Sequence, residues 1–418
     1  MFKRVITIFI LTISLTSLAF AQYGKEINRS GGYARIMSMG NSPYLIDPYF
    51  IAHNPAWSAK FTDFIFGDIG SSTGNDFGSG GNGQFIYADF KLDRQFTMGA
   101  FLARNDFSGV STAALDPFDI TGQINSIGGS VPVIPMDNNV VFLISYIAGV
   151  HNIGVSIAYA GSTNEENLAN GQTTAGNASQ FGLNVGYMGK LTRSIRLAVS
   201  AFFMTPSATR EAPNVNDTKF DQTIIGVNSR IFINMSKKVT IVPIISYLST
   251  KGSADIGDDE GITSTDLPEL SRIRAGFGIV FEHDKLLVSG GPSIEIAKTT
   301  IPAIPGDPEL ENSVFSFPIW NFGAEWELLE WLTARLGYSV STNKVTDETP
   351  IPGNATEVNE TIKTQYSPAN GGMTMGVGFK LGSFYLDATI NEDVLRQGFN
   401  NIGGGGSTFA FLSTGMAF

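Results

Sequence analysis

Apolar and polar residues alternate along most of this chain. From Asp63 to the last residue, the alternation recurs in sixteen segments of about ten residues, the length of a tilted strand that crosses a bilayer. In Arg272–Glu282 the apolar positions are Ile273, Ala275, Phe277, Ile279 and Phe281. A period of two places all of these side chains on one face of a strand. The pattern therefore predicts membrane-crossing β-strands.

The connections between these segments alternate in length. Short ones such as Asp93–Gln95 are followed by long polar ones such as Asn105–Asp137. This alternation is typical of outer-membrane barrels, whose short turns are periplasmic and whose long loops are extracellular. The sequence thus predicts an all-β fold: a single antiparallel transmembrane β-barrel of 14–16 strands. If the number is fourteen, we expect Asp63–Gly70 and Phe384–Asn391 to lie in loops.

The two ends of the chain agree with an exported barrel. Residues 1–21 have two basic residues, an apolar run and an A-x-A site ending at Ala21, so we expect a signal peptide that is cleaved before Gln22. The last segment alternates and ends on Phe418. A final strand of this kind closes a barrel against the first strand, and we expect Phe418 to act as the assembly signal. The expected location is the cell outer membrane of a Gram-negative bacterium.

Composition excludes several classes of protein. Cleavage removes Lys3 and Arg4, which leaves 25 of the 27 basic residues against 38 acidic ones, a net charge of −13. Such a chain is a poor nucleic-acid binder, because that affinity comes from Lys and Arg on phosphates. The absence of cysteine excludes disulfides, thiolate metal sites and cysteine nucleophiles.

No catalytic motif is visible, so we expect no enzyme activity, no cofactor and no catalytic residue. The acidic run 255–261 offers carboxylate oxygens that can hold a divalent cation. Its spacing does not match an EF-hand, so a solvated loop is the preferred interpretation. We therefore expect no metal site.

The side of each strand opposite the apolar set carries arginines and glycines. A charge facing lipid costs about 2–4 kcal/mol at the midplane, so these side chains should face the lumen. The candidate ligand- or lumen-lining residues are Arg196, Arg230, Arg274, Arg335, Phe101, Phe202 and Phe232. An apolar lining with a few cations suits an amphipathic anion such as a fatty acid. The alternative is that the phenylalanines pack on a plug and the arginines pair with lumen acids. The inward glycines indicate either room for something inside or relief of curvature.

The segment before the first strand, residues 22–61, does not alternate. It contains R-S-G-G-Y-A-R-I-M-S-M-G (Arg29–Gly40), and N-P-A (Asn54–Ala56) follows an acidic residue. A second motif is N-F-G-A-E-W-E (Asn321–Glu327) followed by L-T-A-R-L-G-Y (Leu332–Tyr338). These motifs resemble those of the FadL-type outer-membrane transporters of hydrophobic compounds and the related PorV/PorQ β-barrels.

The resemblance implies that residues 22–61 form a hatch inside the lumen and that residues 62–418 form the barrel. The hatch residues that it marks are Gly31, Gly32, Met39, Gly40, Asn54 and Pro55. Irregular backbone at membrane depth survives only inside protein, which agrees with a hatch. The alternative is a periplasmic tail. This chain departs from the motifs at Asn41, where M-G-G is expected, and at Trp57, where N-P-A-G is expected.

The leading functional hypothesis is passive outer-membrane transport of small hydrophobic or amphipathic molecules, fatty-acid-like compounds among them, through a hatch-gated barrel. The alternative is a PorV-like component that binds and hands on secreted proteins without transporting small molecules. The expected partners are outer-membrane lipid and lipopolysaccharide, the barrel-assembly machinery, and either a hydrophobic small molecule or a secreted protein.

Overall fold

The computed structural model describes residues 31–70, 85–104, 110–128, 131–259, 261–303, 308–351, 357–390 and 409–418. The helical elements are α2 (Tyr33–Ser38), the 3-10 helices η1 (Pro48–Ala52) and η2 (Pro55–Trp57), and α3 (Ile120–Ser126). The strands are β1 (Phe64–Gly70), β2 (Phe85–Lys91), β3 (Phe96–Arg104), β4 (Asn138–Ala148), β5 (His151–Asn167), β6 (Thr173–Lys190), β7 (Ile195–Glu211), β8 (Thr218–Asn234), β9 (Val239–Gly257), β10 (Ile262–Asp266), β11 (Glu269–His283), β12 (Leu286–Ile301), β13 (Leu310–Leu329), β14 (Leu332–Pro350), β15 (Val358–Leu381), β16 (Phe384–Ile390) and β17 (Phe409–Ala417). The predicted signal peptide and residues 22–30 lie outside the described residues.

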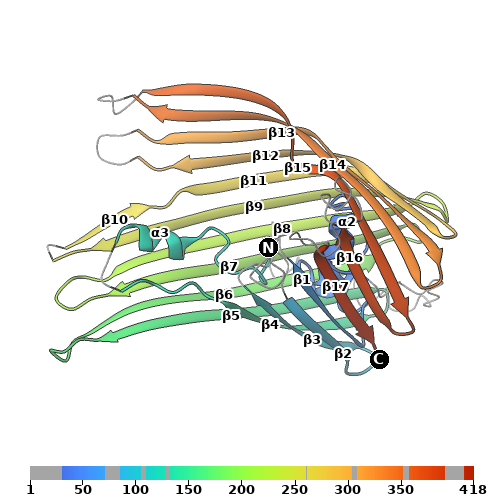
Figure 1. Cartoon of the computed structure of the whole chain (residues 1–418), viewed down its shortest axis with the longest axis horizontal. Coiled ribbons are helices and arrows are strands. Elements are labelled where there is room, and N and C mark those ends of the chain that lie inside the picture. Colours follow the sequence, from blue (N-terminus) through green and yellow to red (C-terminus); the bar gives the residue numbers. More distant parts are fainter. Residues whose placement is uncertain are drawn as a thin grey trace, which may run out of the picture.

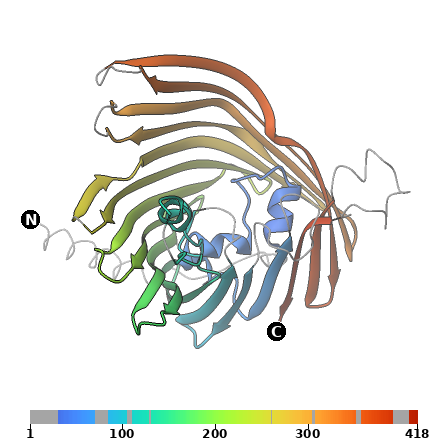
Figure 2. The same cartoon turned by 60° about the vertical axis from the view of Figure 1, so that its left-hand side comes forward.

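The strands form one closed antiparallel barrel (Figures 1 and 2). Each strand pairs with its neighbours in the chain, and β17 pairs with β1 from Phe64↔Ala417 to Gly70↔Phe411. Strand β10 pairs only with β9, and β11 continues along the same side of β9. We therefore count β10 and β11 as one interrupted strand, so the barrel has sixteen strands in all. The predicted fold class is confirmed, at the upper end of the expected strand number.

The fourteen-strand alternative is wrong, because β1 and β16 both belong to the wall. Each is seven residues long. Each has an acid on its inward, buried face: Asp68 of β1 is 2% exposed and Asp387 of β16 is 1% exposed. On β1 the alternation of apolar and polar residues is weak, because Phe64 and Phe66 also face inward and are buried. The two acids are tolerated because Asp68 accepts a hydrogen bond from the N–H of Tyr33 at 3.1 Å and Asp387 pairs with Arg335.

The period-two pattern separates the two faces of each strand. On β11 the apolar side chains of Ile273, Phe277 and Ile279 are 46–54% exposed and form part of the outer surface. On the inward face, the ring of Tyr44 packs against Gly278 from inside the barrel. Large apolar side chains on the outside of a closed barrel are what lipid requires. No helix among the described residues is long and apolar enough to cross a membrane.

The barrel wall has unequal height. Strands β16, β17, β1 and β2 have seven to nine residues, whereas β13, β14 and β15 have 19–24. Figure 1 shows the long strands extending well past the short ones. Full closure is thus limited to one level of the barrel. At this level the backbone N–H of Phe418 donates to the carbonyl of Asp63 at 2.9 Å. This hydrogen bond extends the pairing of the last strand with the first. The assembly role of Phe418 stays a prediction.

Two segments outside the strands fold into the interior (Figure 2). The first, residues 31–61, carries α2, η1 and η2 and keeps the name hatch. The second, residues 110–136 with the exception of 129–130, carries α3 and is called the insert. The insert belongs to the connection 105–137, which the sequence pattern predicts as a long polar extracellular loop. Its described residues fold into the lumen, because Leu115, Ile120 and Ile124 are buried against inward side chains of the wall. The side of the membrane on which this connection lies stays a prediction.

Candidate functional site

Short caps shape the hatch. The side chain of Asp47 accepts a hydrogen bond from the N–H of Tyr49 at 2.9 Å and begins η1, with proline at the next position. Asn54 does the same for η2, accepting from the N–H of Ala56 at 3.0 Å. In each case the side-chain oxygen of the cap and the fixed φ of the proline that follows start a helical turn. The D-P and N-P pairs in the sequence are the local cause of this folding.

The hatch contacts the wall on two sides. Helix α2 packs against β14–β17, and η2 packs against β4–β6. Inward polar side chains satisfy hatch backbone groups: Ser200 donates to the carbonyl of His53 at 2.8 Å, and Asn321 donates to that of Gly40 at 2.9 Å. Thr389 donates to the carbonyl of Ala34 at 2.9 Å. Irregular backbone inside the barrel is thus hydrogen-bonded to the wall rather than left without partners.

The inward glycines form the seat of the hatch. A Cβ at Gly154 would overlap the backbone of Pro55, and one at Gly376 would overlap the side chain of Ser38. The same holds at Gly278 beneath Tyr44. Of the two explanations for the glycines, room for something inside therefore applies at these positions. Met39 and Gly40 lie equally close to Gly323 and Gly337 of the wall.

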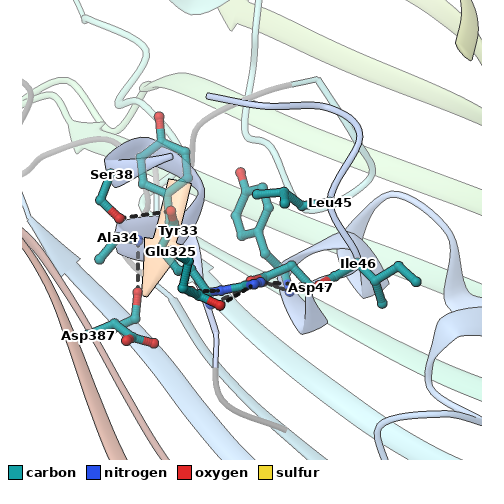
Figure 3. Close-up of polar contacts among 12 residues, drawn as sticks. Tyr33, Ala34, Ser38, Leu45, Ile46, Asp47, Glu325 and Asp387 are labelled. Carbon is teal, nitrogen blue, oxygen red and sulfur yellow. Dashed lines mark hydrogen bonds and ion pairs between the residues drawn. The ribbon is translucent and has the colours of Figure 1, made fainter. Parts of the chain in front are cut away.

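A buried ion network joins the hatch to the wall. Arg35 pairs with Asp47 of the hatch at 3.0 Å and with Glu325 of β13 at 2.7 Å. Arg335 of β14 pairs with Glu325 and with Asp387 of β16, both at 2.6 Å. All five side chains are at most 11% exposed. Figure 3 shows Asp47 from the hatch and Glu325 from the wall converging on one point, with Asp387 at the lower left.

The network places two guanidinium groups among three carboxylates away from water. Burial raises the pKa of Asp47 to about 6, although Arg35 beside it acts in the opposite direction. Buried ion pairs contribute little net stability when complete, but removing one partner leaves an uncompensated charge and is strongly destabilising. The arrangement therefore fixes where the hatch sits. Sequence reasoning did not select Arg35, Asp47, Glu325 or Asp387 as site residues, although the first three lie in the family-like motifs.

A cavity of about 230 Å³ lies between the hatch and the wall. It is lined by Pro43, Phe50, His53, Asn54 and Trp57 of the hatch and by Ala198, Ser200, Asn228, Ser229, Arg230, Ile244, Ile245, Ser246 and Arg274 of β7, β8, β9 and β11. The guanidinium of Arg230 stacks on the ring of Phe50, 3.4 Å from its centroid, and donates to the carbonyl of Leu45 at 3.3 Å. The guanidinium of Arg274 donates to Ser293 and Asn321. The cavity is thus cationic, with aromatic rings on the hatch side.

His53 lies at the edge of this cavity in a desolvated position. Its Nδ1 is buried and has no hydrogen-bond partner among the described residues. Burial, together with the nearby charge of Arg230, lowers the pKa of His53 to about 4. The imidazole is therefore neutral at physiological pH.

The predicted lumen-lining residues all face inward but do not meet at one site. Only Arg230 and Arg274 line the cavity. Arg335 is engaged in the ion network. Arg196 lies near Lys60 of the hatch, whose pKa is lowered to about 7 by burial and by the charges of Arg196 and Lys190.

The three predicted phenylalanines pack rather than line an open space. Phe232 contacts Trp57 of the hatch edge-on, with centroids 5.9 Å apart. Phe101 packs against Tyr87 with centroids 4.2 Å apart. Phe202 joins an apolar cluster below the insert. The interpretation that phenylalanines pack on a plug agrees with Phe232, whereas the ligand role of all seven residues stays a prediction.

Hydrogen bonds from wall side chains to backbone carbonyls hold the insert. Arg210 of β7 donates to the carbonyls of Ile124, at 2.9 Å, and Gly128 at the end of α3. Asn139 donates to the carbonyls of residues 112–114, and Gln180 to that of Ala114 at 2.7 Å. Helix C-terminal carbonyls carry partial negative charge, so a guanidinium there is favourable. No carboxylate forms an ion pair with Arg210 among the described residues.

Comparisons with known proteins give structural neighbours only: no protein-family model matches the sequence, and no curated protein matches it. The toluene transporter TodX of Pseudomonas putida is 10% identical, with a TM-score of 0.36, over 93% of this chain and 96% of TodX. The FrpB iron transporter of Neisseria meningitidis (F3-3 variant) is 11% identical, with a TM-score of 0.41, over 80% of this chain and 62% of FrpB. The copper transporter OprC is 9% identical, with a TM-score of 0.39, over 78% of this chain and 61% of OprC. The chain thus spans under two thirds of FrpB and OprC. It is similar to these transporters in its β-barrel alone.

Proposed function

We propose that this protein lets small hydrophobic or amphipathic molecules cross the outer membrane of a Gram-negative bacterium passively, with the hatch controlling their passage. The observation that supports the proposal most strongly is the cavity between hatch and wall. It combines aromatic rings with guanidinium groups inside a closed barrel. Pockets for small ligands have this character: mostly apolar walls with a few placed polar groups.

The inward positions of β7 show how such a path is layered. From one end, Arg196 lies near Lys60 of the hatch, and Ala198 and Ser200 line the cavity. Phe202 and Met204 then form an apolar cluster with Ile224 and Leu248. Arg210 finally holds the insert. A molecule that enters past the insert thus meets an apolar layer first, then the cationic cavity, then the hatch.

The proposed partners follow from the same architecture. Outer-membrane lipid and lipopolysaccharide would contact the exposed apolar band, and the barrel-assembly machinery would act on the terminal strand that ends at Phe418. A small molecule would occupy the lumen.

A reversible lock on the hatch tests the proposal. Ser42 of the hatch and Ser289 of β12 are both buried, and their Oγ atoms are 2.8 Å apart. The chain has no cysteine, so Ser42→Cys with Ser289→Cys places one defined disulfide between hatch and wall. We expect the oxidised protein in proteoliposomes to lose most of its uptake of toluene and of short fatty acids, and reduction to restore it.

The matched control is a disulfide away from the hatch. Asp255→Cys with Ser264→Cys joins β9 to β10, where the two side chains are 2.6 Å apart. This crosslink should leave uptake unchanged. Uptake that is equal in the oxidised and reduced hatch-locked protein would reject hatch control. A secretion defect in the locked protein with normal uptake would favour the PorV-like role instead.

A further inference from the structure

We propose that the cavity between hatch and wall is a binding site for a compact monocarboxylate, a carboxylate attached to an apolar body about the size of one ring. The inference rests on the proposed transport function and specifies its substrate class. It distinguishes an anionic, amphipathic ligand from an uncharged hydrocarbon. It also distinguishes a small acid from a long-chain fatty acid.

The positive charge of the cavity favours an anionic ligand. Neither Arg230 nor Arg274 forms an ion pair within 4.0 Å among the described residues, whereas Arg35 and Arg335 each have two carboxylate partners. One carboxylate lies near each guanidinium without forming an ion pair: Glu295, the register neighbour on β12, near Arg274, and Asp47 of the hatch near Arg230. Two guanidinium groups at one cavity with only backbone, hydroxyl, amide and ring partners leave positive charge available. A carboxylate is the ligand that guanidinium geometry matches best.

The wall provides neutral donors in the same row as the arginine. Ser200 pairs in register with Asn228, Asn228 with Ser246, and Ser246 with Arg274. All four side chains line the cavity. Ser200 already donates to the hatch, but Asn228 and Ser246 make no side-chain hydrogen bond to the described protein. The row can therefore hydrogen-bond both oxygens of an anion while the charge is supplied by the two arginines.

The neighbouring row is apolar and gives the ligand its orientation. The next inward positions are Phe202 on β7, Gly226 on β8 and Leu248 on β9, again in register. The ring of Phe202 lies over Gly226, which has no side chain to displace it. This packed apolar row closes one side of the polar row, so a carboxylate there would leave its apolar body against Phe50 and Trp57 of the hatch, which line the cavity.

The size of the cavity limits that body. A volume of 230 Å³ corresponds to about seven or eight water molecules at ~30 Å³ each, or one substituted ring. It is below the range of ~300–1,000 Å³ that holds drug-sized ligands. A long acyl chain therefore does not fit within the cavity itself while the hatch is in place, and a cation is disfavoured by both arginines.

The test uses three probes with the same ring: benzoate, benzyl alcohol and benzylamine. We expect isothermal titration of the purified barrel in detergent to show benzoate bound at least ~10-fold more tightly than benzyl alcohol, with no measurable binding of benzylamine. Arg230→Gln and Arg274→Gln should each weaken benzoate at least ~10-fold, and leave benzyl alcohol within about twofold. The control Arg104→Gln removes an exposed arginine far from the cavity and should change nothing.

A second variant keeps both arginines and their packing. Ser246→Asp places a carboxylate beside Arg274 in the wall row, and should abolish the preference for benzoate while heat-modifiable migration of the barrel stays normal. Equal binding of benzoate and benzyl alcohol by the wild-type protein would overturn the inference. Proteoliposome flux separates it from the proposed function: toluene flux without benzoate preference rejects the inference only, whereas benzoate preference without flux of any probe rejects transport only.

Discussion

The hatch and the insert both fill the barrel, but the wall holds them by different forces. The hatch is joined to β13, β14 and β16 through buried ion pairs that centre on Arg35 and Glu325. The insert is held by apolar packing of residues such as Ile120 and Ile124 and by side chains that donate to its backbone carbonyls. A buried ion network fails as a unit when one charge is lost, whereas apolar contacts are lost in increments. The hatch should therefore be fixed or released as a whole, and the insert should loosen gradually.

The difference also separates the two segments as gates. Most of their contacts with the wall differ: the hatch rests on glycines such as Gly376 and on the network, and the insert rests on inward alanines such as Ala178 and Ala208. They share one apolar cluster, through Ala113 and Ala114 of the insert. Sites with few shared partners usually respond almost independently to substitution. Changes that release one segment should therefore leave the other in place. Single cysteines at Ser42 of the hatch and Thr121 of the insert can report each segment, because both positions are buried and the chain has no other cysteine.

The largest expected effect comes from breaking the ion network. Arg35→Met leaves Asp47 and Glu325 without the cation between them, and loss of one partner in a buried pair costs about 3–5 kcal/mol. Labelling of Ser42→Cys by a water-soluble maleimide should rise by at least ~100-fold, since each 1.4 kcal/mol is a factor of ten. Labelling of Thr121→Cys should stay unchanged.

The matched control for this change is Lys298→Met, which removes an exposed ion pair with Glu311. Exposed pairs are worth about 0–1 kcal/mol, so labelling at Ser42→Cys should change by less than about fivefold. Equal effects of the two substitutions would show that the buried network does not hold the hatch.

A smaller and opposite effect is expected from the insert. Arg210→Met removes the donor that satisfies carbonyls at the end of α3, and hydrogen bonds to a charged group contribute about 1.5–3 kcal/mol. Labelling of Thr121→Cys should rise ~10- to 100-fold while that of Ser42→Cys stays constant. Joint release of both cysteines by Arg210→Met would mean that hatch and insert move as one body.

The glycine seat should give an effect of intermediate to small size. Gly376→Ala forces a methyl group into Ser38 and the carbonyl of Ala388, and overpacking of this kind typically costs about 1–3 kcal/mol. We expect labelling of Ser42→Cys to rise ~10-fold. Gly261→Ala is the control, because a Cβ there meets nothing within 4 Å. Indistinguishable labelling of the two alanine variants would show that the inward glycines do not hold the hatch in place.

The barrel could be predicted from sequence because strand periodicity is local. Each strand shows its own lipid-facing set, so β11 is recognised from Ile273, Phe277 and Ile279 without knowledge of its neighbours. The same parity assigned Arg196 and Arg230 to the inward face. Parity fixes the face but not the level along the barrel axis, and the level decides the neighbours. Arg196 therefore lies near Lys60, and Arg230 lies at the cavity.

The ion network and the insert depend on contacts between distant parts of the chain. Arg35 and Glu325 are 290 residues apart, so no window of sequence contains both. The signal that was available is that each lies in one of the two family-like motifs. The insert gave only a weak signal: Ile120 and Ile124 are four residues apart, as on one face of a helix, but a single pair does not reveal a buried segment. The wall alanines that contact them resemble ordinary strand residues.

Lowering the pH should loosen the hatch but not the insert, and this effect is the smallest because His53 and Asp47 act in opposite directions. The pKa of His53 is lowered to about 4 in the folded hatch, against about 6.5 for a free histidine. A released hatch therefore takes up a proton between these values that the seated hatch does not, so release becomes more favourable as pH falls from about 6.5 to about 4 and levels off below. Asp47 acts in the opposite direction, because its pKa of about 6 in the seated hatch exceeds that of a free carboxyl. The contribution of His53 is isolated by comparing wild type with His53→Asn, in which Asp47 is unchanged. We expect the single-channel conductance of wild type in planar bilayers to rise relative to that of His53→Asn across this pH range, and an identical pH profile of the two proteins would contradict it. No histidine lies in the insert, so labelling of Thr121→Cys relative to an exposed cysteine should be flat across the same range.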